Sequence, residues 1–148
     1  MDKGTVRRIV LEFLPNVDHA RRVSPVFLDK KEFERVTGEN GDRCWMVTEG
    51  DYFHRLYINL DLSVKASANR MKAAILHEIG HTQHGRDVGL NEGEYMAQMW
   101  ALGKAYQLIM KEGVGLVAEV RRELLHWECS SDPEYKYVYD RAKMEAII

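Results

Sequence analysis

The segment His77–His81, with the sequence HEIGH, restricts the possible folds of this chain more than any other part of it. Apolar residues precede it at helical spacing, at Met71, Ala74 and Ile75, so the pattern predicts an amphipathic helix. Two histidines four residues apart differ by about 40° around a helix, so both imidazoles can reach one metal ion. The fold must therefore place this helix beside another segment that completes the site.

The glutamate between the two histidines gives the segment its chemical meaning. A pair of helical histidines with an intervening glutamate is typical of zinc hydrolases of the metalloprotease kind. Glu78 would act there as a general base on a zinc-bound water. The alternative is a pair of surface histidines on an ordinary amphipathic helix, with no metal.

Two histidines do not complete a catalytic zinc site, which has three protein ligands and one position open to water. His84 lies on the same helical face, but histidines at positions 0, 4 and 7 of a straight helix span about 10 Å, too far for one ion. Asp87 has the spacing of a ligand that follows a sharp turn. The glycine for such a turn, Gly85, stands one place late.

The remaining candidates, Glu92 and Glu94, begin the next predicted helix. Glu94 shares its helical face with the small residues Ala97 and Ala101, which would let the two helices approach closely. Glu92 lies about 200° away around the helix, where it would provide a favourable charge in the first turn. We therefore expect Glu94 to join His77 and His81 as a zinc ligand, with Glu92, Asp87 and His84 as the alternatives.

The chain reads as one α+β domain over residues 1–148, with a small sheet in the first half and helices in the second. A hairpin is expected at about 43–60 and the active-site helix at about 68–84, capped by Ser67 or Asn69. The second run of the hairpin, 53–60, is expected to be an edge strand to which a peptide substrate adds. Outside this region the pattern predicts helices at 3–14, 29–36, 92–111, 117–127 and 133–146, and a short strand within 17–28.

Composition excludes some functions. The net charge of −2 gives no bulk signal for nucleic-acid or membrane binding. No apolar run approaches the roughly 20 residues that span a bilayer, and the first residues lack the pattern of a signal peptide. We therefore expect a cytoplasmic protein in which Cys44 and Cys129 are free thiols.

Peptide hydrolysis also requires a hydrogen-bond donor for the oxyanion that forms at the carbonyl. The candidates for this role or for substrate contact are His54, Tyr52, Tyr57, Tyr95 and Tyr106. Gln98 lies one helical turn after Glu94, where it could hydrogen-bond a metal ligand.

HEIGH, followed by Glu94–Ala101 with the sequence EYMAQMWA, resembles the ImmA/IrrE family of small zinc metallopeptidases. That family shows H-E-L-G-H and then E-x-x-A-N-x-F-A, and the similarity extends over about 55–105. The resemblance implies a zincin fold and Glu94 as the third zinc ligand. It also implies cytoplasmic bacterial or phage origin and, often, cleavage of a regulatory protein such as a repressor. The short link from His81 to Glu94 favours a compact type from a phage or mobile element.

Together these patterns predict a zinc-dependent metallopeptidase that hydrolyses peptide bonds in a protein or peptide substrate. The alternative is a zincin-fold module that binds zinc and docks a protein partner with little or no proteolysis. The glutamate at position 78 favours the enzyme, because a purely structural metal site needs no carboxylate there.

Overall fold

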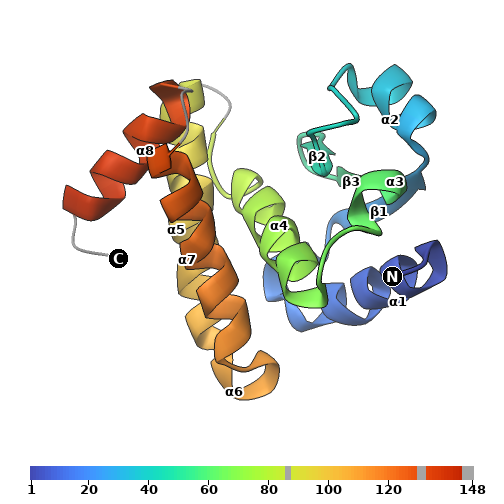
Figure 1. Ribbon diagram of the computed structural model, residues 1–148, viewed down its shortest axis with the longest axis horizontal. Coiled ribbons are helices and arrows are strands. Elements are labelled where there is room, and N and C mark those ends of the chain that lie inside the picture. Colours follow the sequence, from blue (N-terminus) through green and yellow to red (C-terminus); the bar gives the residue numbers. More distant parts are fainter. Residues whose placement is uncertain (86–87, 130–132, 145–148) are drawn as a thin grey trace.

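The computed structural model describes residues 1–85, 88–129 and 133–144 (Figure 1). It confirms a mixed α+β fold, with a small sheet in the first half and helices in the second. The first half contains α1 (Lys3–Phe13), η1 (Leu14–Asn16), η2 (Asp18–Ala20), β1 (Val23–Leu28), α2 (Lys30–Thr37), β2 (Met46–Glu49), β3 (His54–Asn59) and α3 (Leu60–Ser63). The second half contains α4 (Ala68–His81), α5 (Leu90–Gln107), α6 (Ile109–Glu112), α7 (Val114–Cys129) and α8 (Pro133–Met144).

The sheet has the order β1-β3-β2, with β3 parallel to β1 and antiparallel to β2. The predicted hairpin is therefore confirmed, and its turn uses Gly50 at φ 126°. A Cβ there would lie 2.1 Å from the carbonyl oxygen of Phe53, so only glycine fits.

The prediction that 53–60 forms an edge strand is wrong, because β3 is the central strand. Its residues from Leu56 to Asn59 are all buried, so both faces of the strand are covered. The alternation of polar and apolar residues concealed this, since the polar Asn59 is fully buried and its side chain amide donates to the carbonyls of Gly41 and Cys44. Within the described residues, the other side of β2 pairs with no strand, and β2 is the edge beside α4.

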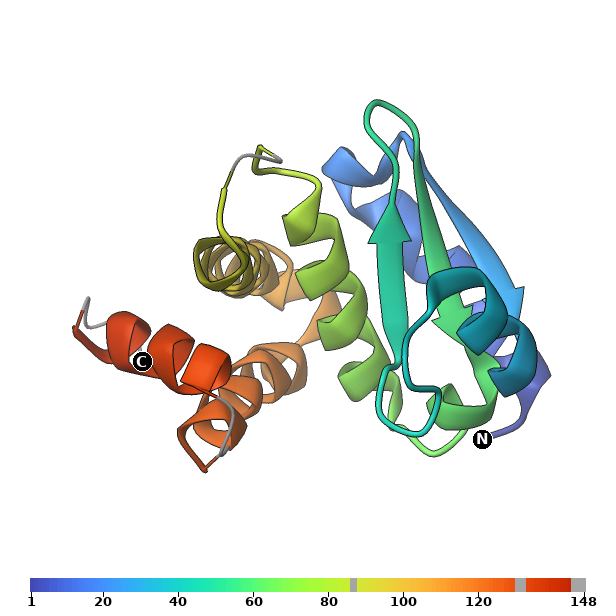
Figure 2. The same cartoon turned by 90° about the horizontal axis from the view of Figure 1, so that it is seen from above.

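One face of the sheet forms the main hydrophobic core with α1 and α4. Leu56 and Ile58 of β3 join Val10 of α1 and Leu76 of α4 in a single buried cluster. Because side chains alternate along a strand, Tyr57 lies on the opposite face from this core. α4 therefore packs on the sheet through its apolar side and runs beside the edge strand β2 (Figure 2).

Helix α4, which carries the HEIGH segment, begins where the sequence predicted. The hydroxyl of Ser67 accepts from the backbone N–H of Arg70 at 3.1 Å, which caps the N-terminus. The helix ends at His81, three residues before the predicted boundary at 84. Thr82 closes the last turn, because its backbone N–H and its hydroxyl both donate to the carbonyl of Ile79.

α5 and α7 pack against α4 on the side away from the sheet, and α8 packs on α5 and α7 (Figures 1 and 2). Gly80 of α4 allows the closest approach, since a Cβ there would lie 2.5 Å from the carbonyl oxygen of Ala97 in α5. The predicted helix 92–111 is interrupted at Leu108, where α5 ends and the short α6 begins. No helix in the described ranges is both long and apolar enough to cross a bilayer.

Candidate metal centre

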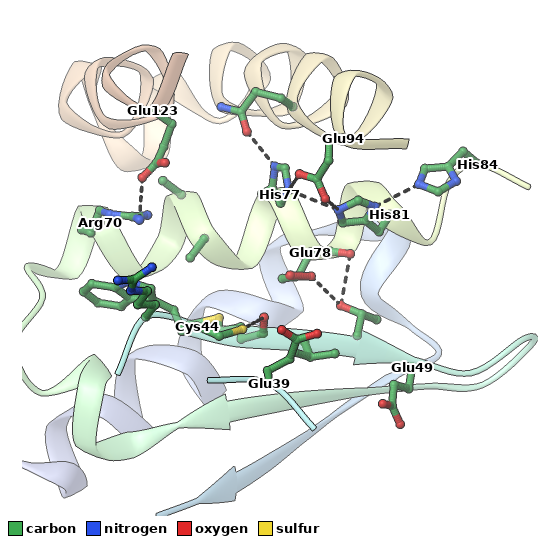
Figure 3. Close-up of a pocket in the computed structure, with 18 of the residues that line it drawn as sticks. Glu39, Cys44, Glu49, Arg70, His77, Glu78, His81, His84, Glu94 and Glu123 are labelled. Atoms are coloured by element: carbon green, nitrogen blue, oxygen red, sulfur yellow. Dashed lines mark hydrogen bonds and ion pairs between the residues drawn. The ribbon is translucent and has the colours of Figure 1, made fainter. Parts of the chain in front are cut away.

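The two histidines of α4 and Glu94 of α5 meet at one point (Figure 3). The Nε2 atoms of His77 and His81 lie 3.2 Å apart. The carboxylate oxygens of Glu94 lie 3.0 Å from Nε2 of His77 and 3.1 Å from Nε2 of His81. The arrangement follows from the four-residue spacing on α4 and from the close packing of α5 at Gly80.

These distances fit a zinc ion. Ligand atoms about 2.0–2.1 Å from a tetrahedral zinc lie roughly 3.3 Å from each other. Nε2 of His77 lies 3.2 Å from Nε2 of His81 and 3.0 Å from Oε2 of Glu94, and Nε2 of His81 lies 3.1 Å from the other oxygen of Glu94, Oε1. Two neutral imidazoles and one carboxylate are also the His₂Glu donor set of catalytic zinc sites. The described residues contain this single group of three or more potential metal ligands.

Gln98 determines which nitrogen of His77 faces the metal point. Its amide Nε2 donates to the backbone carbonyl of Val120 in α7 at 2.9 Å, and a carbonyl can only accept. The amide Oε1, 2.7 Å from Nδ1 of His77, must therefore accept from Nδ1–H. In the neutral imidazole, Nε2 of His77 then carries the lone pair that a metal can bind. Gln98 is 2% exposed, so water does not compete for these hydrogen bonds.

Glu78 extends from α4 towards β2, on the side of the helix next to the metal ligands (Figure 3). The hydroxyl of Thr48 donates to its carboxylate at 3.3 Å and to its backbone carbonyl at 3.2 Å. Burial raises the pKa of Glu78 above the ordinary carboxyl value, against the opposing charges of His77 and His81. A carboxylate with a raised pKa is a better general base near neutral pH.

The charges of His77 and Glu94 depend on each other. Burial lowers the pKa of His77, but the hydrogen bond and charge of Glu94 outweigh it and raise the pKa to about 9. Burial raises the pKa of Glu94, but hydrogen bonds from His77 and His81 dominate and hold it well below the ordinary value. The protein thus stabilises positive charge at the point where a divalent cation would bind.

The other candidates for the third ligand lie elsewhere. Glu92 accepts hydrogen bonds from Tyr137, at 2.5 Å, and from Arg141, so it links α5 to α8. His84 lies behind His81, with its Nε2 3.0 Å from Nδ1 of that ring, and not at the metal point. Asp87 lies outside the described residues.

A groove of about 900 Å³ runs between α4 and β2, with the metal ligands at one end. At its other end Arg70 pairs with Glu123 at 2.5 Å and lies over the ring of Trp45. Among the described residues that line the groove, none is a sequence-based candidate for oxyanion or substrate contact, namely His54, Tyr52, Tyr57, Tyr95 and Tyr106.

These five side chains lie outside the groove. Tyr57 lies on the far face of the sheet, and Tyr95 is 7% exposed beneath the guanidinium of Arg141. Tyr52 and Tyr106 lie on the surface against the guanidinium groups of other residues, Arg22 and Arg121. His54 begins β3 at the hairpin turn, outside the groove.

The sequence did not single out Thr48 or the edge of β2. Thr48 stands opposite Leu56 on the face that contacts α4, and this register depends on the pairing of β2 with β3. The hairpin could be predicted from its turn. Which of its two strands lies beside α4 depends on which strand pairs with β1. The missing signal was therefore the position of β1, which is distant along the chain.

Comparisons with models of protein families, with curated proteins and with solved structures found no match to this chain.

Proposed function

We propose that this protein is a zinc-dependent peptidase. The observation that carries the proposal is the convergence of His77, His81 and Glu94, whose potential ligand atoms lie within 4.8 Å of one another beside both Glu78 and a groove. His77, His81 and Glu94 would hold the ion. Bound there, zinc would lower the pKa of a water molecule and polarise the carbonyl of a substrate.

Glu78 supplies the proton transfer in this mechanism. Its carboxylate takes one proton from the attacking water as the water oxygen bonds to the carbonyl carbon, and delivers it to the amide nitrogen as the C–N bond breaks. Thr48 holds the carboxylate in place through its hydroxyl. Gln98 keeps His77 in the tautomer that exposes Nε2.

The edge of β2 is the surface on which we place the peptide substrate. Hydrogen-bonded pairs alternate in an antiparallel ladder, and the N–H of Asn59 donates to the carbonyl of Trp45. By this alternation the backbone groups of Met46 and Thr48 turn to the open side, which faces the groove and α4. An extended peptide that pairs with them would add a strand and lie across Glu78.

The same proposal includes a zincin-type fold and a relationship to the ImmA/IrrE peptidases. The packing of a His-Glu-x-x-His helix against a helix that begins with Glu94 supports it. A regulatory protein with an extended, accessible segment is the substrate class that we propose. An open groove beside a strand edge favours such a segment over a folded domain.

The experiment is cleavage of an unstructured protein by the zinc-loaded wild type and by Glu78→Gln. Gln keeps the size of the side chain but cannot take a proton. We therefore expect zinc to remain bound and the rate of hydrolysis to fall by about 10²–10⁴-fold, the usual contribution of a general base. Mass spectrometry of the products measures the rate and maps the cleavage sites.

Undiminished cleavage by Glu78→Gln would remove Glu78 from the mechanism. Zinc binding without any cleavage in the wild type would favour instead a module that docks a protein partner.

A further inference from the structure

His84 lies just beyond the end of α4 and contacts the ring of a metal ligand from behind (Figure 3). Its Nδ1 lies 3.0 Å from the carbonyl oxygen of Gly85. Its Nε2 lies 3.0 Å from Nδ1 of His81. The ring is half-buried, and both of its nitrogens have partners.

The chemistry of these partners fixes the positions of the hydrogens. The carbonyl of Gly85 can only accept, so Nδ1 of His84 carries the hydrogen. In a neutral imidazole the other nitrogen is then an acceptor, so Nε2 of His84 accepts from Nδ1–H of His81. Nε2 of His81 keeps its lone pair and points at His77 and Glu94.

Gly93, in the first turn of α5, leaves space for the ring of His84. A Cβ at residue 93 would lie 3.2 Å from both Cε1 and Nε2 of the His84 ring. The absence of a side chain at 93 therefore lets the ring pack on the helix that carries Glu94. His84 connects one ligand on α4 with the start of the helix that supplies the third.

We propose that His84 is a positioning residue that sets the tautomer and the ring orientation of His81 for metal binding. His84 accepts from Nδ1–H of His81, as Gln98 accepts from Nδ1–H of His77. Each histidine of the proposed site therefore has its own hydrogen-bond acceptor. The inference rests on the proposed zinc site, and outer hydrogen-bond partners of this kind commonly change metal affinity by 10–100-fold.

The test compares zinc affinity, measured by competition with a chromophoric chelator, in wild type, His84→Ala and His84→Gln. We expect Ala to weaken binding by about 10–100-fold, because the acceptor is lost. The amide oxygen of Gln reaches a similar position to Nε2, so His84→Gln should recover most of the loss. Gln83→Ala, at an exposed neighbour, is the matched control and should bind zinc like wild type.

Gly93→Ala provides a second variant that keeps every hydrogen-bonding group. A methyl at position 93 should displace the ring by a few tenths of an ångström and weaken zinc binding in the same direction as His84→Ala. Since alanine favours helix over glycine, this variant should remain folded.

NMR of protein labelled with ¹⁵N-histidine separates positioning from simple packing. The Nδ1 proton of His81 should exchange slowly with water in wild type and in His84→Gln, and rapidly in His84→Ala. Equal zinc affinity in all variants would overturn the inference, as would a loss in His84→Ala with no rescue by Gln and no change in proton exchange. If the wild type binds no zinc, the proposed function fails, while the same Nδ1 proton still reports whether His84 accepts it.

Discussion

Glu92 and Glu94 stand two residues apart at the start of α5, yet they have different tasks. Glu94 points at the histidines of α4, and Glu92 binds Tyr137 and Arg141 of α8. Helical geometry alone predicts that the two side chains point in different directions. The small residue Ala97 on the face of Glu94 indicated which of them would meet α4, and it is fully buried there.

Substitution of these two glutamates separates metal binding from helix packing. Glu94→Ala removes one of three ligands, so zinc affinity should fall by more than the roughly 10–100-fold that loss of an outer partner costs. Glu92→Ala should leave zinc affinity near the wild-type value while lowering the free energy of unfolding, because Tyr137 and Arg141 of α8 lose their hydrogen-bond acceptor on α5. Chelator competition and thermal melting measure the two effects. Equal losses of zinc affinity in both variants would refute the assignment of the third ligand.

The coupling of His77 to Glu94 makes zinc binding depend on pH. The pKa of His77 in the folded protein is about 9, against about 6.5 for an unperturbed histidine. The His77–Glu94 ion pair therefore stabilises the zinc-free fold fully below pH 6.5, and that stabilisation is lost as pH rises through 9.

Zinc must displace this proton. Its apparent affinity should therefore rise by about tenfold per pH unit between pH 6.5 and 9. Titrations at three pH values in this range, corrected for ionisation of the competing chelator, test this. An affinity that stays constant would show that His77 binds no proton there, or that it is not a ligand.

At the scale of the elements, the site depends on how closely α5 approaches α4. Gly80, inside the motif, is the contact point, since any side chain there would collide with the backbone of Ala97. The glycine at the fourth place of the motif is thus a packing requirement, which the ligand pattern alone did not reveal. It sets the distance over which Glu94 must reach the histidines.

Alanine at Gly80 and, as a comparison, at Gly103 tests this packing. Gly80→Ala places a methyl 2.5 Å from the Ala97 carbonyl oxygen, so it should lower the free energy of unfolding by about 1–3 kcal/mol and weaken zinc binding. Gly103→Ala, in α5, meets nothing within 4 Å and should raise stability by up to about 1 kcal/mol through helix propensity. Chemical denaturation gives both values. A Gly80→Ala protein as stable as wild type would contradict the close approach.

The hairpin shows where sequence patterns stop being informative. Its two strands and its turn at Gly50 were predicted, because turn chemistry and β-branched residues are local signals. The place of the hairpin in the sheet was not predicted, because it depends on β1. That strand ends 26 residues before β3 begins, and its pairing with β3 makes β3 the central strand. The strand beside α4 is consequently β2, and the proposed substrate edge is Met46–Glu49 in place of 53–60.

At the scale of the whole molecule, the chain forms two parts that meet at α4. The sheet with α1 packs on one side of this helix, and α5 and α7 pack on the other (Figure 2). α4 contributes Met71, Ile75 and Leu76 to the core and presents its histidines towards α5. The mixed fold and the meeting of His77, His81 and Glu94 were predictable, since both depend on helical periodicity. The groove was not, because it depends on packing between distant segments.

The central claim is that His77, His81 and Glu94 bind one zinc ion. Its most direct test is the metal content of wild-type protein purified without chelator and of the double variant His77→Ala/His81→Ala, by inductively coupled plasma mass spectrometry. We predict about one zinc per wild-type chain and almost none in the variant. Wild-type protein without zinc that also fails to take up added zinc, or a variant that holds as much zinc as wild type, would contradict the claim.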